Sequence, residues 1–455
     1  MTAIHKLREI VIGKPLDPMN PETRRHMVLI SFLAWIGLGA DGLSSSAYGP
    51  EEAFLALGEH THLGLYLALA TALTVFIISF AYNQVIELFP NGGGGYKVAS
   101  QLIGPHAGLV SGAALLVDYV LTIAISIASG TDALFSLLPL AAQPFKLAVE
   151  AGLAVMLIAL NLRGMKESIK LLLPIFIGFF LTHVFLIGYG IAAHAEGLPL
   201  LIPNAVGETT ALTQELGWIF VASLFLRAYS LGGGSYTGLE AVSNNVNILA
   251  EPRVRTGKWT MFYLAVSLSI VAGGIILLYL LWEAQPVPGQ TLNAVTFKAI
   301  IEHLDLGTPF ANALGLLVVL VLEAGLLFVA ANTGFLGGPA VLSNMAADSW
   351  VPRQFRQLSS RLVTQNGILL MGLGALGVLL WSNGSVALLV VLYSINVFLT
   401  FSMSLFGLTV HWWRRRRDAP HWRRRFALSV VGLIVTSGIL AVTLVAEPGG
   451  RATCD

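Results

Sequence analysis

The sequence predicts an all-α polytopic membrane protein, and three features of its composition and patterning indicate this class. Of its 455 residues, 55% are hydrophobic and only 11% are charged. Its mean hydropathy is +0.76. Apolar runs long enough to cross roughly 30 Å of hydrocarbon as a helix recur along the whole chain. A framework of internal disulfide bonds is excluded, since Cys454 is the only cysteine in the sequence.

Eleven apolar segments are predicted to span the membrane. The first follows a charged stretch and has no small-residue cleavage site, so we do not expect a removable signal peptide. Each segment is expected to form one helix or one interrupted helix. They lie near residues 27–57, 63–89, 98–138, 145–162, 169–193, 214–249, 259–282, 309–346, 367–382, 385–410 and 426–446.

The positions of the basic residues predict the orientation of the chain. Loops rich in Lys and Arg stay on the cytoplasmic side, and alternate loops of this sequence are basic. The N-terminus is therefore predicted to be cytoplasmic. The arginine cluster between Arg414 and Arg425 fits this topology, and binding of anionic lipid head groups is an alternative reading of the same cluster.

We predict one transport core, residues 27–410, made of two inverted repeats. Residues 39–49 (GADGLSSSAYG) and 229–240 (YSLGGGSYTGLE) are too rich in glycine and serine for unbroken helices. They lie five spans apart, and an odd-numbered repeat enters the membrane from opposite sides in its two copies. Freed carbonyl groups at such breaks can coordinate a cation. The predicted parts are a cytoplasmic tail (1–26), the repeats (27–193 and 214–410), a basic cytoplasmic loop (411–425), an eleventh helix (426–446) and a tail (447–455).

Three acidic residues, Asp41, Asp118 and Glu240, lie inside apolar segments. A charge near the bilayer midplane costs roughly 2.5–3.5 kcal/mol, so each acid is a candidate functional residue. Asp118, Thr122 and Ser126 are spaced by four residues and form one stripe on a helix. Such oxygen atoms can replace the water shell of a monovalent cation. For Thr122 and Ser126 alone, hydrogen bonding between helices is an equally good interpretation.

The remaining polar residues of these segments allow both structural and functional readings. Glu240 follows Thr237 by three residues, so we expect the two to share a helical face just beyond the second break. Crowding of buried acids predicts that at least one of the three is neutral and can carry a proton. A purely structural acid is the alternative for Glu240. For His183, Glu323 and Arg227, structural pairing is the expected role.

No enzymatic motif accompanies these residues. The glycine-rich run at residues 91–97 (NGGGGYK) follows no strand and precedes no Lys-Ser or Lys-Thr pair, so we reject a phosphate-binding loop. Ser and His residues have no triad spacing, and no cluster of His, Cys and carboxylate residues indicates a catalytic metal. We therefore expect a protein that is not an enzyme, has no cofactor and binds no nucleic acid.

Several longer motifs carry a family resemblance. They are DGLSSSAYGPEE, FPNGGGGYKVAS, LLVDYVLTIAISIASGTDAL, NLRGMKES, TGLEAVSN, AANTGF and VVLYSINVF. At these residues the chain resembles the amino acid–polyamine–organocation (APC) superfamily, and within it the KimA-type branch of the KUP potassium-uptake transporters. The resemblance implies a LeuT-like fold with five-plus-five inverted repeats, broken segments 1 and 6, and further helices after the repeats. It implies proton-coupled potassium uptake across the cytoplasmic membrane.

The resemblance also implies roles for individual residues. Glu240 is implied as the proton-coupling acid, and Asp41 and Asp118 are candidates to share that role. Transported potassium and protons are the only ligands expected. The implied potassium ligands are Asp41, Tyr48, Asp118, Tyr119, Thr122, Ser126, Thr237 and Tyr393.

Alternatives remain open at this point. An amino acid or polyamine permease of the same superfamily is the main one, because two or three acids can also bind an ammonium group. A non-transporting sensor or scaffold would leave the three buried acids without a purpose. The resemblance implies a homodimer built partly through a twelfth segment and a cytoplasmic C-terminal domain that have no match in these 455 residues. A C-terminally truncated fragment is therefore a further expectation.

Overall fold

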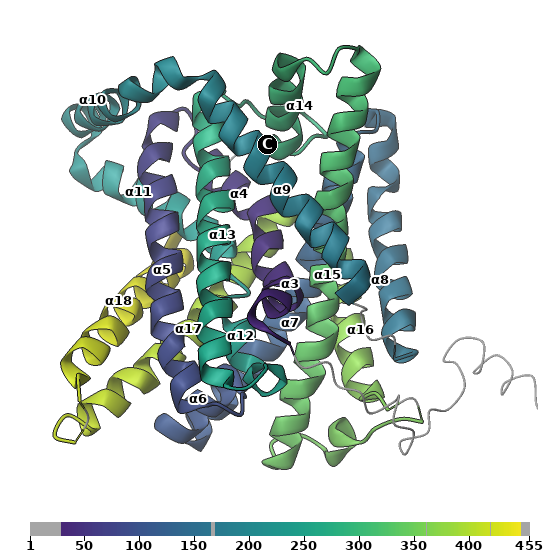
Figure 1. Cartoon of the computed structure of the whole chain (residues 1–455), viewed down its shortest axis with the longest axis vertical. Helices are drawn as coiled ribbons and strands as arrows, with labels where there is room; N and C mark the ends of the chain where they lie inside the picture. Colours follow the sequence, from purple (N-terminus) through teal and green to yellow (C-terminus); the bar gives the residue numbers. More distant parts are fainter. Residues whose placement is uncertain (1–28, 165–168, 361, 419, 447–455) are drawn as a thin grey trace, which may run out of the picture.

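The computed structural model describes residues 29–164, 169–360, 362–418 and 420–446. Within these ranges, nine helices are long and apolar enough to cross a membrane. Figure 1 shows them as a bundle whose long helices run between two ends of the molecule. The nine are α5 (Gly64–Leu88), α7 (Pro105–Phe135), α8 (Lys146–Leu162), α9 (Ile169–Ala193), α13 (Arg253–Leu281), α15 (Pro309–Ala347), α16 (Gln365–Ser382), α17 (Val386–Arg414) and α18 (Trp422–Ala446).

Seven further α-helices complete the described part. Two of them, α10 and α14, lie at one end of the molecule, which we call the α10–α14 end, and α6 lies at the opposite end (Figure 1). The seven are α3 (Ser31–Ser44), α4 (Gly49–Leu55), α6 (Gly94–Leu102), α10 (Leu198–Leu216), α11 (Trp218–Leu231), α12 (Glu240–Asn244) and α14 (Leu292–Leu304).

The nine long helices coincide with nine of the eleven predicted segments, which confirms the all-α membrane class. The other two are the segments that we predicted to be broken, and both are interrupted. The first consists of α3, a 3-10 turn η1 (Ser45–Ala47) and α4; the second consists of α11, a 3-10 turn η5 (Gly232–Tyr236) and α12. The total of eleven spans and the inverted repeat stay predictions, and the two predicted tails lie outside the described residues.

Helix α7 forms the centre of the bundle. It packs against α15 and α17. Of its most apolar 18-residue stretch, 72% is buried, the largest share among the nine helices. Helix α15 approaches α7 closely at Gly337, where a Cβ atom would lie 2.3 Å from the Tyr119 ring. Small residues allow membrane helices to come this close. Helix α18 packs on α17 and α5 at the periphery, and 28% of its most apolar 18-residue stretch is buried.

The first break is narrower than predicted. Helix α3 continues through Asp41 to Ser44, so the aspartate lies in its last turn rather than in an irregular loop. The hydroxyls of Ser44, Ser45 and Ser46 each donate to the carbonyl oxygen three residues earlier, at 2.5–2.8 Å. Serine hydroxyls thus bond local carbonyl groups and keep this stretch helical, with a change to a 3-10 turn at its end.

The second break differs from its predicted geometry at Thr237. Thr237 has extended backbone (φ −71°, ψ 160°), and α12 begins only at Glu240. Gly238 lies between them with φ 75°, a left-handed conformation that glycine adopts without strain. The expectation that Thr237 and Glu240 share one helical face is therefore wrong, because the chain turns sharply between them.

Candidate functional site

The two interrupted segments cross in direct backbone contact. A Cβ atom on Gly238 would lie 2.4 Å from the amide nitrogen of Gly42, and one on Gly49 would lie 2.7 Å from the amide nitrogen of Ser235. Side chains larger than hydrogen do not fit at either contact. The glycines of the two breaks therefore serve a shared purpose, which is to bring the irregular backbone of segment 1 against that of segment 6 in the core of the bundle.

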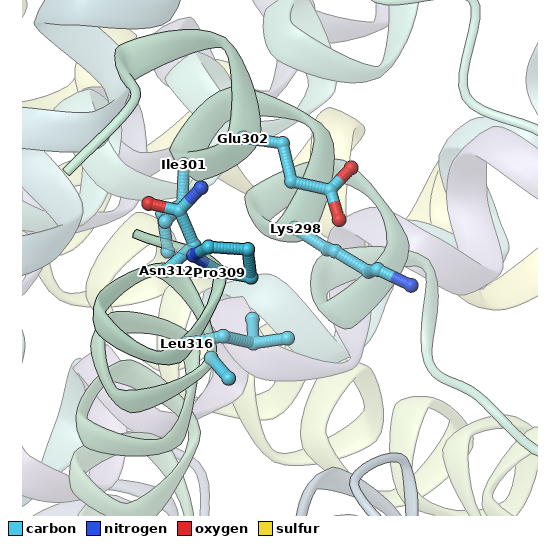
Figure 2. Close-up of a pocket in the computed structure, with 7 residues that line it drawn as sticks. Lys298, Ile301, Glu302, Pro309, Asn312 and Leu316 are labelled. Atoms are coloured by element: carbon cyan, nitrogen blue, oxygen red, sulfur yellow. The ribbon is translucent and has the colours of Figure 1, made fainter. Parts of the chain in front are cut away.

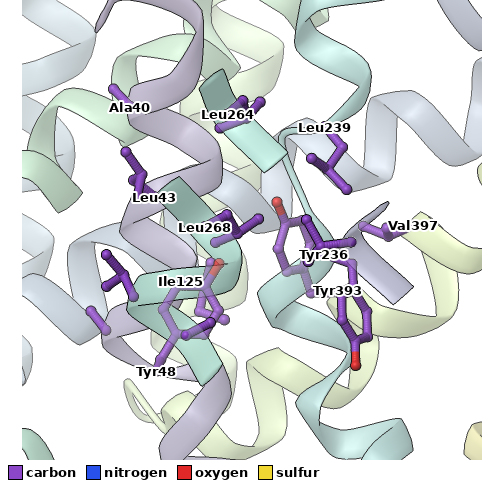
Figure 3. Packing of buried hydrophobic residues seen from close by; sticks show 14 of the residues in the cluster. Ala40, Leu43, Tyr48, Ile125, Tyr236, Leu239, Leu264, Leu268, Tyr393 and Val397 are labelled. Atoms are coloured by element: carbon purple, nitrogen blue, oxygen red, sulfur yellow. The ribbon is translucent and has the colours of Figure 1, made fainter. Parts of the chain in front are cut away.

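Aromatic and aliphatic side chains seal this crossing. Figure 3 shows Tyr48 and Leu43 from segment 1, Tyr236 from segment 6 and Tyr393 from α17 among the buried side chains around it. Tyr236 and Tyr393 are at most 1% exposed. Polar groups inside this shell are thus removed from bulk water, so each of them needs a partner in the protein or a ligand.

The three acids predicted from the sequence lie around the crossing. Asp41 is in the last turn of α3, Asp118 is in the middle of α7, and Glu240 is the first residue of α12. Their exposed fractions are 6%, 2% and 7%. They lie close enough together for the charges of Asp41 and Glu240 to act on Asp118. The structure thus brings together three carboxyl groups that are far apart in the sequence.

Two of these acids have an oxygen atom without a partner. Asp118 Oδ1 and Glu240 Oε2 are buried and accept no hydrogen bond within the described part of the chain. The Asp41 carboxyl group, in contrast, faces the hydroxyl of Thr333 on α15. Buried carboxyl oxygens normally accept hydrogen bonds, and leaving them unpaired is costly. The two orphan oxygens therefore mark a place where a cation or a proton can be held.

Hydroxyl groups adjoin the acids on the side of α17. The Thr122 hydroxyl donates to the carbonyl oxygen of Asp118 (2.9 Å) and lies 3.1 Å from the phenol oxygen of Tyr393. The Tyr48 phenol faces the hydroxyls of Thr237 and Tyr393. Four of the predicted ligands, contributed by segment 1, segment 6, α7 and α17, therefore form one cluster of oxygen atoms beside Asp118.

The other two predicted ligands lie apart from this cluster. The Tyr119 phenol accepts a hydrogen bond from Asn244 Nδ2 (3.2 Å) at the far end of α12. Ser126 is buried on α7, one turn beyond Thr122. Tyr119 and Ser126 are thus positioned at the margins of the acid cluster, and their roles as ligands stay predictions.

Some polar residues near the site were not selected from the sequence. Thr333 faces Asp41, Asn244 bonds Tyr119, and the hydroxyl of Ser394, next to Tyr393, has no partner within the described ranges. Each is a small polar residue inside or beside an apolar segment, and that signal was available. It was too common among membrane helices to single these residues out.

The glycine-rich run at residues 91–97 supports segment 6. The amide of Gly93 donates to the carbonyl oxygen of Asn244 (3.2 Å), and a Cβ atom on Gly94 would collide with the Asn244 side chain. Gly94 has φ 46°. The loop therefore holds the C-terminal end of α12, which carries Glu240 at its other end.

Two further observations bound the chemistry of the site. Within the described residues, no three His, Cys, Asp or Glu side chains meet in a set that would hold a metal ion by themselves. Mixed carboxyl, hydroxyl and carbonyl oxygens suit hard cations rather than thiolate- or imidazole-seeking metals. The hollow of about 360 Å³ in Figure 2, lined by Lys298, Glu302 and Asn312, lies between α14 and α15 and includes none of the three acids.

The predicted structural pairing is found for His183 and Glu323 but not for Arg227. His183 Nε2 lies 3.4 Å from Glu323 Oε2. Arg227 is exposed on α11, and no ion pair joins it to an acid in the described part of the chain. The expectation that Arg227 pairs inside the bundle is therefore wrong, because its side chain lies on the outer surface of α11.

A helical bundle with two interrupted segments that cross beside buried acids defines a class of membrane transporter. The sequence model described as amino acid permease matches residues 34–453, and the chain belongs to this family. The protein is therefore a multi-pass membrane protein of a transporter family.

Individual relatives sharpen this assignment. The potassium transporter KimA of Bacillus subtilis (strain 168) is 29% identical over 448 residues, which cover 97% of this chain and 70% of that protein. Two solved mutant structures of a manganese transporter from Eremococcus coleocola have 12% sequence identity and a TM-score of 0.50, with 97% of this chain and 90% of theirs covered. These structures support the fold alone.

Proposed function

We propose that this protein is a secondary active transporter that takes up potassium ions together with protons across the cytoplasmic membrane. The observation that carries the proposal is the pair of orphan oxygens, Asp118 Oδ1 and Glu240 Oε2, buried beside Asp41 where the two interrupted segments cross. The similarity to a potassium transporter favours potassium among the cations that such oxygens can bind.

The ion is proposed to lie between Asp118 and the neighbouring hydroxyl cluster. Asp118 contributes charge, and Tyr48, Thr122, Thr237 and Tyr393 contribute neutral oxygen atoms. Neutral oxygens that replace the hydration shell bind a monovalent cation firmly enough to select it and weakly enough to release it. Tyr119 and Ser126 complete the proposed set from its margins.

Proton coupling is proposed to follow from the charge balance of the three acids. One monovalent cation offsets one negative charge, whereas Asp41, Asp118 and Glu240 together carry up to three. Protons must offset the rest, because uncompensated charge in a water-excluded site is costly. Glu240 is the proposed carrier, since its orphan oxygen lies at the start of the short helix α12 and can hold a proton when the ion is absent.

The proposed orientation places the N-terminus and α6 in the cytoplasm. Support comes from the distribution of basic residues. The arginine-rich ends of α17 and α18 lie at the same end as α6 in Figure 1, opposite α10 and α14. Basic loops on one side follow the usual asymmetry of membrane proteins.

A cationic amino acid or a polyamine is the second candidate substrate, and the three acids are the observation that favours it. A neutral amino acid fits less well. Carriers with broken helices hold a substrate carboxylate on freed amides near a positive helix end. Here Asp41 lies one turn before the first break and would repel that carboxylate.

Growth of a potassium-uptake-deficient host at limiting potassium tests the proposal directly. We expect the wild-type chain to restore growth and to take up rubidium, which serves as the probe ion in place of potassium. Neutral amino acids in large excess are expected not to compete with this uptake. Absence of rescue with the protein present in the membrane, or clear competition by a cationic amino acid or a polyamine, would move the assignment to the second candidate. Clear competition by a neutral amino acid would move it to an amino acid permease.

A further inference from the structure

A second group of buried polar side chains lies outside the proposed ion site, between α9, α14 and α15. His183 of α9 is 0% exposed and Glu323 of α15 is 1% exposed. His183 Nε2 and Glu323 Oε2 lie 3.4 Å apart. Phenylalanine rings enclose the imidazole: Phe179 lies against its face, and Phe297 meets it edge-on. A titratable pair is thus fully enclosed in the membrane-spanning part of the protein.

The hydrogen-bond geometry fixes the number of protons on this pair. His183 Nδ1 lies 2.9 Å from the carbonyl oxygen of Phe179. A carbonyl only accepts, so Nδ1 carries a hydrogen atom. Nε2 then faces Glu323 Oε2, and two lone pairs would repel each other at this position without a proton between them. Besides the hydrogen atom on Nδ1, one proton is therefore shared between Nε2 and Glu323 Oε2, as imidazolium with carboxylate or as imidazole with carboxylic acid, and the pair is neutral overall.

The second oxygen of Glu323 connects the pair to segment 1. Asn293 Nδ2, at the start of α14, donates to Glu323 Oε1 (3.3 Å) and lies 3.4 Å from the carbonyl oxygen of Ala47. Asn293 Oδ1 accepts from the Tyr279 hydroxyl (2.6 Å), which fixes the orientation of the amide. Ala47 belongs to the 3-10 turn that interrupts segment 1. One amide group is therefore shared between the proton-holding pair and the break.

Other titratable groups lead from the pair toward the α10–α14 end. Glu51 of α4 lies within electrostatic reach of Glu323, Glu52 and Asp132, and its carboxyl group faces the backbone amide of Leu292. Glu51 is half-buried, and α4 lies between α3 and the α10–α14 end in Figure 1.

The other members of this group are already engaged. Asp132 is bound by Lys146 (2.6 Å), and the Tyr279 hydroxyl donates to Asn293. Glu51 is therefore the acid of α4 whose charge reaches Glu323 from the half-buried region near α4.

We propose that His183 and Glu323 form a second protonation site of the transport cycle. Asn293 couples the protonation state of this site to segment 1. The inference rests on the proposed proton-coupled transport. With its proton, the pair is neutral and Asn293 is shared between Glu323 and Ala47. Without it, the buried carboxylate attracts the Asn293 amide more strongly and draws it away from the Ala47 carbonyl. Proton loss thus loosens the contact between α14 and the break.

Glu323→Gln is the test variant, because a glutamine amide can donate to His183 Nε2 while its oxygen still accepts from Asn293. Rubidium uptake by the purified full chain in liposomes is measured against external pH at a fixed membrane potential. We expect the pH midpoint of uptake to shift by about one pH unit or more, or the pH dependence to flatten, relative to wild type. Rubidium binding, measured separately, is expected to be retained, since the ion ligands are unchanged.

Glu208→Gln is the matched control. Glu208 pairs with His60 at 3.3 Å, but these side chains are 18% and 30% exposed and lie near α10. This variant is expected to keep the wild-type pH profile. If Glu323→Gln does not fold, the double variant His183→Gln with Glu323→Gln replaces the pair by two amides that can bond each other without a titratable proton.

The outcomes separate this inference from the proposed function. A wild type that takes up no rubidium, or whose uptake is independent of pH, overturns the proposed function and this inference with it. A wild type with pH-dependent uptake and a Glu323→Gln or double variant with the same pH profile overturns this inference alone.

Discussion

The Thr122 hydroxyl lies 3.1 Å from the phenol oxygen of Tyr393, which joins α7 to α17 directly beside Asp118. Both side chains are nearly fully buried, at 2% and 1% exposed. A polar contact between two central helices at this depth contributes to packing, and its oxygens also face the acid cluster. Whether the contact serves packing alone or also ion binding is decided by substitutions that keep the shape of the side chains.

Tyr393→Phe removes the phenol oxygen and keeps the ring. We expect the rubidium concentration that gives half-maximal uptake to rise roughly fivefold to tenfold. A buried hydrogen-bonding oxygen contributes about 1 kcal/mol, and about 1.4 kcal/mol corresponds to a tenfold change in affinity. Initial uptake rates over a range of rubidium concentrations measure this. Tyr263→Phe, at a position 36% exposed on α13, is the control. Equal half-saturation for Tyr393→Phe and wild type would assign the contact to packing only.

Asp118→Asn removes the charge beside an oxygen atom that has no protein partner within the described residues. We expect rubidium uptake to be lost while the protein still reaches the membrane, since a neutral amide supplies a much weaker ligand. Uptake is measured in cells with expression matched by blot. Asp305→Asn is the control, because Asp305 lies in an exposed turn with φ 49°, where Asn is tolerated. Full uptake by Asp118→Asn would remove Asp118 from the site.

Glu240→Gln imitates a permanently protonated acid. The variant is expected to keep some ion binding and to lose uptake driven by an inward proton gradient, because its side chain can no longer release a proton when the ion arrives. Liposomes with an imposed pH gradient separate uptake from binding.

Glu302→Gln, at the exposed hollow of Figure 2, is the control for Glu240→Gln. It is expected to respond to the gradient as the wild type does. The same response from Glu240→Gln would make Glu240 a structural acid.

Different parts of this structure were predictable from the sequence to different degrees. Nine spans followed from hydropathy alone, because the hydrocarbon core sets a minimum apolar length. The two interruptions followed from local glycine and serine content. Helix α10, in contrast, lies mostly between two predicted segments, 169–193 and 214–249, where we predicted no span. Its mixed composition gives no span signal, and the helix lies against α11, α5 and η2 (Thr61–Leu63) with only Ala205 and Leu212 buried.

The residues of the candidate site could be predicted from the sequence, but their arrangement in space could not. Asp41, Asp118 and Glu240 stood out because acids are rare in apolar segments. That Asp118 and Glu240 each keep an orphan oxygen, whereas Asp41 faces Thr333, depends on contacts between segments hundreds of residues apart. The extended backbone at Thr237 likewise arises from the crossing with segment 1. A stripe or face argument within one segment cannot foresee either feature.

Gly238→Ala tests that crossing. Gly238 has φ 75°, and a Cβ atom would lie 2.4 Å from the amide nitrogen of Gly42. The left-handed conformation costs a non-glycine residue roughly 1–2 kcal/mol, and the collision with backbone adds to this. We therefore expect a lower melting temperature, less folded protein in the membrane and loss of rubidium uptake. Thermal unfolding of purified protein and uptake at matched expression measure these effects.

Gly377→Ala is the matched control for Gly238→Ala. Gly377 lies within helix α16, and a Cβ atom there meets nothing within 4 Å. Alanine is favoured over glycine in a helix by up to about 1 kcal/mol, so this variant should keep the wild-type melting temperature or raise it slightly. If Gly238→Ala behaves like Gly377→Ala in both measurements, the two interrupted segments do not need their close backbone contact, and the proposed ion site loses its geometric basis.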